Sequence, residues 1–496
     1  MTRLDPGMAV PFGGDRLAFV GEELAAAFLP GDSLLVSQRS GELLHIRAAT
    51  RAVVSASIDD AVVAFRTMAG MPAGRRGHFF DAFASRLAED AIWETILRAN
   101  KADVLRVHGR GRDVSRLGLN DVSRHDMIAG LRAWATITRR PEHAVARIDH
   151  QGWQVEAHRA PLGVIGFVFE GRPNVLADAC GVLATGNAAV LRIGDDAAGT
   201  ANALLRHALE PALEEAQLPQ GAVTVLPPLG REAAWALVTD RRLGLAVARG
   251  SGPAVQLLGD LASQAGIPVS LHGVGGAWLV ADHSADAGRF AAVVEASLDR
   301  KVCNTLNTCC ILRSRAHDLV PLLVESMTAA GRRLGREARL HVLAGSEDDV
   351  AADLFTREVG VERHGAWVTE PFASLIQPAD LGTEWEWEGT PEVTLLVVDD
   401  LDEAVYLLNR HAPRFVASLI AEDGLAQESF YQAVDAPFVG DGFTRWVDGQ
   451  YALGEPELGL ANWEFGRPLG RASVLTGAGT HTLRLRMRQA DPTLRR

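Results

Sequence analysis

The sequence predicts an α/β fold with two parallel sheets, because short apolar strands alternate with helical segments along two separate stretches of the chain. In the first stretch, which starts at Pro161, strand-like runs lie at Val164–Phe169, Asn187–Ile193, Val223–Leu226 and Leu245–Val247. In the second, from about Ala291 to Asp435, such runs lie near Cys309–Leu312, Thr394–Val398 and Phe415–Ile420. Strands separated by helices form right-handed βαβ units and therefore parallel sheets. The two domains are expected to meet near residue 285.

The part of the chain before the first sheet is expected to hold short strands and then long helices. Residues 1–57 contain the turn pairs Gly13-Gly14 and Pro30-Gly31, and we treat them as an N-terminal extension of unknown role. From about Ile58 the pattern becomes helical. Two helical stripes of apolar residues consist of Phe79, Phe80, Phe83, Leu87, Ile92 and Ile96, and of Met127, Ile128, Leu131 and Trp134.

Two further segments indicate strands at the periphery. Ala144–Ala160 alternates polar and apolar residues around Gln151-Gly152, which predicts a hairpin that leaves the main domain, and Thr482–Met487 is also strand-like. Paired peripheral strands often extend a sheet across a subunit interface. We therefore expect a homo-oligomer, either a dimer or a tetramer.

Composition excludes several classes of partner. The formal net charge of −13 argues against a general binder of nucleic acid or of anionic membranes, which needs a basic surface. No apolar run is long enough to span a bilayer, and the first residues lack the pattern of a signal peptide. Four cysteines in 496 residues do not form a disulfide framework. We expect a cytoplasmic protein with reduced thiols.

Cys303 is the first candidate for chemistry. It lies in Arg300-Lys301-Val302-Cys303-Asn304, where two cations precede the thiol and a helix could start after it. Nearby cations and backbone amides stabilise the reactive thiolate. A buried structural cysteine is the alternative. Cys309 and Cys310 lie in an apolar run and are expected to be structural.

Three other candidates follow predicted strands. Asn174 could donate its amide to a developing oxyanion, with an ordinary Pro-Asn turn as the alternative. Arg192 and Gly194 end one strand, and the turn Arg249–Gly252 lies between a strand and a helix. Both suit the ribose or phosphates of a nucleotide, with ordinary turns as the alternative. No phosphate-binding loop of the Walker type and no zinc-ligand spacing is found in the sequence, so no metal is expected.

Several motifs, in the same order along the chain, resemble those of the aldehyde dehydrogenase superfamily. They are Pro161-Leu162-Gly163-Val164-Ile165-Gly166, Glu170 to Val175, Gly186-Asn187 to Arg192, Arg249-Gly250, His272-Gly273, Val302-Cys303-Asn304, Asp402-Glu403-Ala404, Thr444-Arg445-Trp446 and Asp448-Gly449. Within the superfamily the chain is similar to the γ-glutamyl phosphate reductases, also called glutamate-5-semialdehyde dehydrogenases. The resemblance extends from about residue 58 to residue 475.

The resemblance implies an aldehyde-dehydrogenase-like fold with three parts. A Rossmann-type cofactor-binding domain would consist of residues 58–143 and 161–285, and an α/β catalytic domain of residues 286–437. Residues 144–160 and 438–496 would form a small β element for oligomerisation.

The resemblance also assigns the site. Cys303 would be the nucleophile, and Asn174 with the Cys303 amide would form the oxyanion hole. The cofactor, NADP with NAD as the alternative, is expected at Arg192, Gly194, Arg249, Gly250, Ser251 and Gly252, with Glu388 at the nicotinamide ribose. The substrate is expected at Arg172, Arg445, Asn304 and His272. The two arginines would bind its carboxylate or phosphate, with ion pairs within the protein as the alternative.

One absence predicts the direction of the reaction. Hydrolytic aldehyde dehydrogenases carry a Glu-Leu-Gly-Gly segment whose Glu activates water, whereas Leu271–Gly276 here contains no carboxylate. A thioester on Cys303 would then be protected from water. We therefore expect reduction of a small-molecule acyl phosphate, L-glutamyl 5-phosphate, to L-glutamate 5-semialdehyde and phosphate, a step of proline biosynthesis.

Two other functions stay open. Several substrate-side motifs differ from the family, including Gly171 where it has Ser and Val274 where it has Asp. A paralogue that reduces another acyl phosphate or an acyl-CoA would fit these departures. A catalytically inactive scaffold or regulatory subunit, using residues 1–57 to bind a partner, is the alternative of another class. For the cofactor, Asp195 and Asp196 would repel the 2′-phosphate of NADP if they face it.

Overall fold

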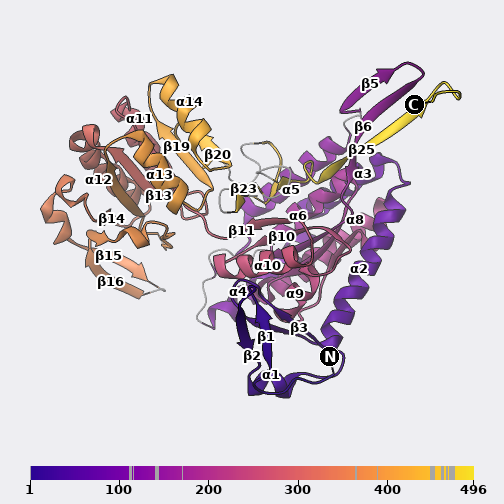
Figure 1. Ribbon diagram of the computed structural model, residues 1–496. Helices are drawn as coiled ribbons and strands as arrows, with labels where there is room; N and C mark the ends of the chain where they lie inside the picture. Colours follow the sequence, from indigo (N-terminus) through magenta and orange to yellow (C-terminus); the bar gives the residue numbers. More distant parts are fainter. Residues whose placement is uncertain are drawn as a thin grey trace. The chain divides into compact units, whose positions relative to one another are not determined.

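The computed structural model describes residues 2–110, 114, 117–139, 144–169, 171, 173–363, 366–387, 389–446, 453–459, 463–464, 467–468 and 475–495. The chain forms two units, the first of Met1–Gly273, Leu453–Gly459 and Val474–Arg496 and the second of Val274–Ala452 and Leu460–Ser473 (Figure 1). They divide between Gly273 and Val274, ahead of the expected position near residue 285, because the strand at Ala277–Ala281 already belongs to the second sheet.

The first unit contains a five-stranded parallel sheet in the order β11-β10-β7-β8-β9. Its strands are β7 (Val164–Phe169), β8 (Ala188–Ile193), β9 (Val223–Val225), β10 (Leu243–Arg249) and β11 (Val269–His272). The chain first forms β7, β8 and β9 in order towards one side of the sheet. It then returns to form β10 next to β7 and β11 beyond it, which is the doubly wound order of a Rossmann-type domain. The four strands predicted here are confirmed, and β11 was missed.

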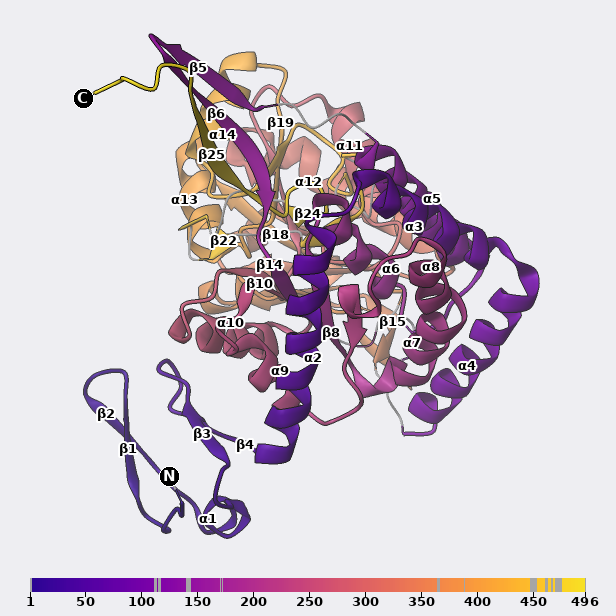
Figure 2. The ribbon, with the colours of Figure 1, turned by 90° about the vertical axis from the view of Figure 1, so that its right-hand side faces the viewer.

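Helices surround this sheet (Figure 2). They are α2 (Ala48–Met68), α3 (Ala73–Ala88), α4 (Asp90–His108), α5 (Asp121–Thr138), α6 (Val175–Ala179), α7 (Ala198–Leu204), α8 (Glu210–Glu215), α9 (Glu232–Val238) and α10 (Gly252–Gln264). The helical region begins at Ala48, earlier than the predicted start near Ile58. The first apolar stripe is divided at Glu89 between α3 and α4, and its members Phe79 and Phe83 are fully buried.

The N-terminal extension forms two hairpins, as the short strands and turns predicted. They pair β1 (Ala9–Phe12) with β2 (Arg16–Phe19) and β3 (Ser33–Val36) with β4 (Leu43–Ile46), and the short helix α1 (Glu22–Ala27) lies between them. Leu4, Val20 and Phe28 form a small core within this extension.

A separate three-stranded antiparallel sheet projects from the first unit (Figure 1). It consists of β5 (Ala146–His150), β6 (Trp153–Pro161) and β25 (His481–Gln489), in the order β25-β6-β5. The predicted hairpin around Gln151-Gly152 and the predicted late strand are therefore confirmed. Gly152 has a φ of +81°, a conformation that the tight turn requires and that glycine adopts without strain.

The second unit contains a seven-stranded parallel sheet in the order β17-β14-β18-β13-β12-β19-β20. Its strands are β12 (Ala277–Ala281), β13 (Leu306–Leu312), β14 (Arg339–Leu343), β17 (Ala373–Ile376), β18 (Glu392–Val398), β19 (Val416–Ile420) and β20 (Phe438–Gly440). Its helices are α11 (Ala287–Ala296), α12 (Ala316–Arg333), α13 (Leu401–His411) and α14 (Gly424–Ala433). The three strands predicted for this stretch are confirmed as β13, β18 and β19.

Short strand pairs complete the described part of the chain. They are β15 (Glu358–Arg363) with β16 (Ala366–Pro371), β21 (Glu457–Gly459) with β24 (Leu475–Thr476), and β22 (Trp463–Glu464) with β23 (Arg467–Pro468). Within the described ranges, every helix is too short or too polar to cross a membrane.

Candidate active site

Cys303 lies in a turn directly before β13. The predicted helix start after Cys303 is wrong, because Leu306–Leu312 is a fully buried strand. The Cys303 side chain is half-buried and packs against Ala277, Phe415 and Val416. The other three cysteines are completely buried, and burial raises the pKa of each thiol well above its usual range. Cys303 is therefore the cysteine that a reactant can approach most readily.

Backbone hydrogen bonds fix the turn that carries Cys303. The Gly276 amide donates to the Cys303 carbonyl at 2.6 Å, and the Ala277 amide donates to the Thr305 carbonyl at 2.9 Å. A Cβ atom on Gly275 would lie 2.4 Å from the Cys303 carbonyl oxygen and 2.7 Å from its Cα. Backbone atoms cannot move aside as a flexible side chain can, so this close approach requires glycine at position 275.

This site is at the amino ends of the strands of the second sheet. The turn of Gly275-Gly276 precedes β12, and the turn of Cys303 precedes the neighbouring strand β13. Ligands of open α/β sheets usually bind at the carboxyl ends of the strands. That general expectation is wrong for Cys303, because its loop connects the helix α11 to a strand rather than a strand to a helix.

Two predicted substrate residues lie beside the Cys303 turn. Both side-chain polar atoms of Asn304 are buried and have no hydrogen-bond partner among the described residues, while its carbonyl accepts from the Thr444 hydroxyl at 2.9 Å. A buried amide without partners is costly and often has a functional cause. The buried Arg445 donates to Asp299 at 2.5 Å, which is the ion-pair arrangement that the sequence left open.

The predicted residues of the first unit lie at the carboxyl edge of its sheet. Asn174 follows β7 and is the residue before α6, without a side-chain capping hydrogen bond. Arg192 lies near the end of β8, and Arg249 and His272 are paired at the ends of β10 and β11. One Arg192 guanidinium nitrogen lies 3.3 Å from Asp195 Oδ1 and 3.3 Å from the Gly230 carbonyl. This is the edge at which doubly wound sheets bind nucleotides.

The turn Arg249–Gly252 connects β10 to α10, as predicted, but offers fewer amides than expected. The Gly250 amide donates to the His272 carbonyl at 3.2 Å, and Pro253 has no N–H. Arg249 donates to the Glu457 carbonyl at 3.4 Å. The N-terminus of this 13-residue helix still favours an anion such as a pyrophosphate. The anion would find fewer backbone N–H donors there, because the Gly250 amide is already bonded and Pro253 has none.

Two predicted residues fall outside the described part of the chain, and one residue of the site was not predicted. Arg172 and Glu388 lie outside the described residues. Glu384 was not predicted, although its carboxylate binds both Lys301 and the Gly275 amide. No local signal indicates this, because the contacts join three distant parts of the sequence. Among the residues that the structure describes, no group of three or more His, Cys, Asp or Glu side chains is placed to hold a metal ion.

The sequence pattern of the aldehyde dehydrogenase family matches residues 37–342, which is more than half of the chain. The chain therefore belongs to the aldehyde dehydrogenase family.

Solved structures with the same fold include a γ-glutamyl phosphate reductase from Thermotoga maritima. It is 22% identical, with a TM-score of 0.72, and the match covers 89% of this chain and 100% of that one. The NADP complex of the glyceraldehyde-3-phosphate dehydrogenase GapN from Methanocaldococcus jannaschii is 15% identical, with a TM-score of 0.63 and coverage of 91% and 97%. An NAD-dependent benzaldehyde dehydrogenase from Corynebacterium glutamicum is 17% identical, with a TM-score of 0.58 and coverage of 99% and 97%. At these identities the likeness shows the fold, and the predicted aldehyde-dehydrogenase-like fold is confirmed.

Proposed function

We propose that this protein reduces an acyl phosphate, L-glutamyl 5-phosphate, to L-glutamate 5-semialdehyde and phosphate through a thioester on Cys303. The observation that carries the proposal is the half-exposed Cys303 thiol beside a Gly275-Gly276 turn that holds no free carboxylate. Glu384, the carboxylate that binds this turn, has one oxygen on Lys301 and the other on the Gly275 amide. A carboxylate held in this way is a poor base for activating water.

In the proposed reaction, the Cys303 thiolate attacks the acyl carbonyl, a C–S bond forms, and the C–O bond to phosphate breaks. The Asn174 side chain and the Cys303 amide are the proposed donors to the oxyanion. Arg192, Gly194, the Arg249–Gly252 turn and Glu388 are proposed to hold NADPH or NADH. When bound, the nicotinamide supplies the hydride that converts the thioester into a thiohemiacetal. Cleavage of the C–S bond then releases the aldehyde and restores the thiolate.

The reverse reaction tests the proposal directly. Glutamate 5-semialdehyde and the protein are incubated with NADP⁺, and in parallel with NAD⁺, with and without inorganic phosphate. The proposal expects nicotinamide reduction that depends on phosphate. Nicotinamide reduction that does not depend on phosphate would rule out an acyl phosphate substrate. Nicotinamide reduction that requires coenzyme A instead would identify an acyl-CoA substrate.

A different acyl group is supported by one observation. Arg445, a predicted partner of the substrate carboxylate or phosphate, is buried and forms an ion pair with Asp299. A paralogue with another acyl phosphate or an acyl-CoA as substrate is therefore the second candidate. A panel of aldehydes, each tested with phosphate and with coenzyme A, separates the two candidates. An inactive scaffold would instead give wild-type and Cys303→Ala proteins that are equally inert with every acyl donor.

The cofactor preference is expected to depend on Asp195. Its carboxylate lies beside Arg192, where it would accept a hydrogen bond from the ribose of NAD and repel the 2′-phosphate of NADP. Asp195→Asn should therefore raise the ratio of kcat/KM for NADP⁺ over NAD⁺ by about tenfold. Asp196→Asn, one residue further on, is the matched control. An equal change of the ratio in both variants would contradict this role.

We further propose that the sheet of β25, β6 and β5 forms a subunit interface of a homo-oligomer. Leu483, Leu485 and Met487 alternate along the edge strand β25 and are about half exposed or more. An exposed apolar stripe on an edge strand is a surface that a second copy can cover. Leu485→Glu should lower the molar mass measured by light scattering to that of a smaller assembly. A wild-type monomer would contradict the proposal.

A further inference from the structure

We infer that Glu384 is a positioning residue for the nucleophile, because its carboxylate joins Lys301 to the Gly275 amide and thereby fixes the loop that carries Cys303. The inference rests on the proposed role of Cys303. It also assigns Lys301 a partner within the protein, where the sequence alone placed it as a cation beside the thiol.

The two contacts of Glu384 are short and shielded from solvent. Oε1 lies 2.7 Å from the Lys301 ammonium, and Oε2 accepts from the Gly275 amide at 2.6 Å. Only 7% of the Lys301 side chain and 14% of the Glu384 side chain are exposed. Charge-assisted hydrogen bonds away from water are stronger than those at the surface. Glu384 therefore connects the segment before β12 with the segment before β13, two residues from Cys303.

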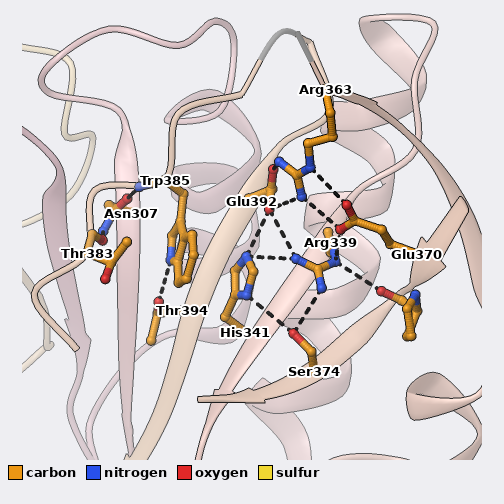
Figure 3. A network of polar contacts seen from close by, with 11 residues as sticks. Asn307, Arg339, His341, Arg363, Glu370, Ser374, Thr383, Trp385, Glu392 and Thr394 are labelled. Atoms are coloured by element: carbon orange, nitrogen blue, oxygen red, sulfur yellow. Dashed lines mark hydrogen bonds and ion pairs between the residues drawn. The ribbon is translucent and has the colours of Figure 1, made fainter. Parts of the chain in front are cut away.

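The Asn307 side chain binds the backbone of Thr383 and Trp385, the two neighbours of Glu384 in the chain (Figure 3). The side-chain amide nitrogen of Asn307 donates to the Thr383 carbonyl at 2.9 Å, and the side-chain amide oxygen accepts from the backbone N–H of Trp385 at 2.9 Å. One side chain of β13 thus binds the backbone on both sides of Glu384. Asn307 lies near the start of β13, directly after the turn that carries Cys303, so the carboxylate and the nucleophile are both held by this part of the chain.

Trp385 adds a second support (Figure 3). Its ring stacks on His341 with centroids 3.6 Å apart and planes 10° apart, and its indole N–H donates to the Thr394 hydroxyl at 2.7 Å. His341 in turn lies 2.9 Å from the buried Glu392. A side chain held by packing and by hydrogen bonds at both ends has little freedom. The segment around Glu384 is therefore rigid enough to set the position of Lys301.

The pairing predicts an electrostatic effect that a purely structural role would not give. In the wild type the Lys301 ammonium and the Glu384 carboxylate balance each other close to Cys303 in the chain. Glu384→Gln leaves the cation unbalanced and should stabilise the Cys303 thiolate, whereas Lys301→Met leaves the anion unbalanced and should destabilise it. The other charged groups of this loop, Arg300 and the Asp299–Arg445 pair, are unchanged in both variants.

The test measures the pH midpoint of Cys303 alkylation by iodoacetamide on the full chain, with Cys303→Ala as the blank for other thiols. Glu384→Gln should lower the midpoint and Lys301→Met should raise it, each on the order of half a pH unit or more. The double variant should return close to the wild-type midpoint. Each single variant should also reduce kcat about tenfold through loss of loop geometry.

Two control variants separate the Glu384–Lys301 pair from other changes in the same segments. Glu386→Gln removes an exposed carboxylate from the same segment and should leave the midpoint unchanged, and Lys301→Arg keeps the cation and should retain the wild-type value. Shifts of Glu384→Gln and Lys301→Met in the same direction, or no shift in Glu384→Gln, would overturn the inference. If Lys301→Met does not fold, Glu384→Gln against Glu386→Gln decides. Alkylation needs no substrate, so this outcome is separate from failure of the acyl phosphate assignment.

Discussion

Cys303→Ala is expected to reduce nicotinamide-dependent turnover by about 10³-fold or more, because no other thiol can take its place in forming the thioester. The remaining cysteines are fully buried, and burial raises the pKa of their thiols and keeps them in the unreactive protonated form. Turnover is measured with glutamate 5-semialdehyde, phosphate and NADP⁺ or NAD⁺, and the acyl-enzyme of the wild type is sought by mass spectrometry.

Cys309→Ala is the matched control for the loss of a thiol. Cys309 lies in β13, shortly after Cys303, and is completely buried in the core of the second unit. Its replacement should lower the unfolding temperature slightly, through the lost packing, and leave kcat close to that of the wild type. Two results would contradict the role of Cys303 as the nucleophile. One is a Cys303→Ala protein that keeps a tenth of wild-type turnover, and the other is a Cys309→Ala protein that loses more turnover than Cys303→Ala does.

The predicted strands are apolar runs, whereas one of the missed strands, β14, is interrupted by polar residues. Val164–Phe169 and Thr394–Val398 are apolar runs, and apolar runs between helices indicate buried parallel strands. The strand β14 was missed because Arg339 and His341 interrupt its apolar pattern. Both are buried or nearly so, and their partner is Glu392, which is far away in the sequence. Patterns of hydrophobicity cannot identify a buried polar strand whose partners come from elsewhere.

The residues of the candidate site that lie at the ends of predicted strands could be predicted from the sequence. Asn174, Arg192 and Arg249 were proposed because each follows or ends an apolar run, and the topology of the first sheet places those ends at one edge. Glu384 could not be found in this way, since its role comes from contacts with Lys301 and Gly275. Pairings between distant segments are set by the packing of the second sheet and not by local sequence.

A buried cluster of charges in the second unit gives the second large effect (Figure 3). Glu392, only 1% exposed, lies 2.9 Å from His341 Nε2 and 3.4 Å from an Arg339 nitrogen, and both of its oxygens contact Arg363, at 2.5 Å and 3.1 Å. Glu370 binds the same two arginines at 3.0 Å and 2.8 Å. The two carboxylates balance the two guanidinium groups, so loss of either carboxylate leaves a positive charge that is partly buried and uncompensated.

Glu392→Gln should therefore lower the free energy of unfolding by about 3 kcal/mol at pH 7, as measured by urea denaturation. The same change at Glu358, which is exposed at the start of β15, should alter it by less than about 0.5 kcal/mol. A loss below about 1 kcal/mol in Glu392→Gln would show that the cluster contributes little.

The pH dependence of this difference provides an independent check. Burial raises the pKa of Glu392, but the hydrogen bonds and charges of His341 and Arg363 outweigh it and lower the pKa to about 2. A carboxylate whose pKa is lower in the folded state stabilises the fold above its unfolded pKa of about 4.3 and loses that contribution as the pH falls towards the folded value. The difference in free energy of unfolding between the wild type and Glu392→Gln should therefore stay constant from pH 7 to pH 5 and become smaller below about pH 4. A gap that widens as the pH falls through this range would contradict an ionised Glu392, because a protonated carboxyl and a glutamine amide differ little in charge.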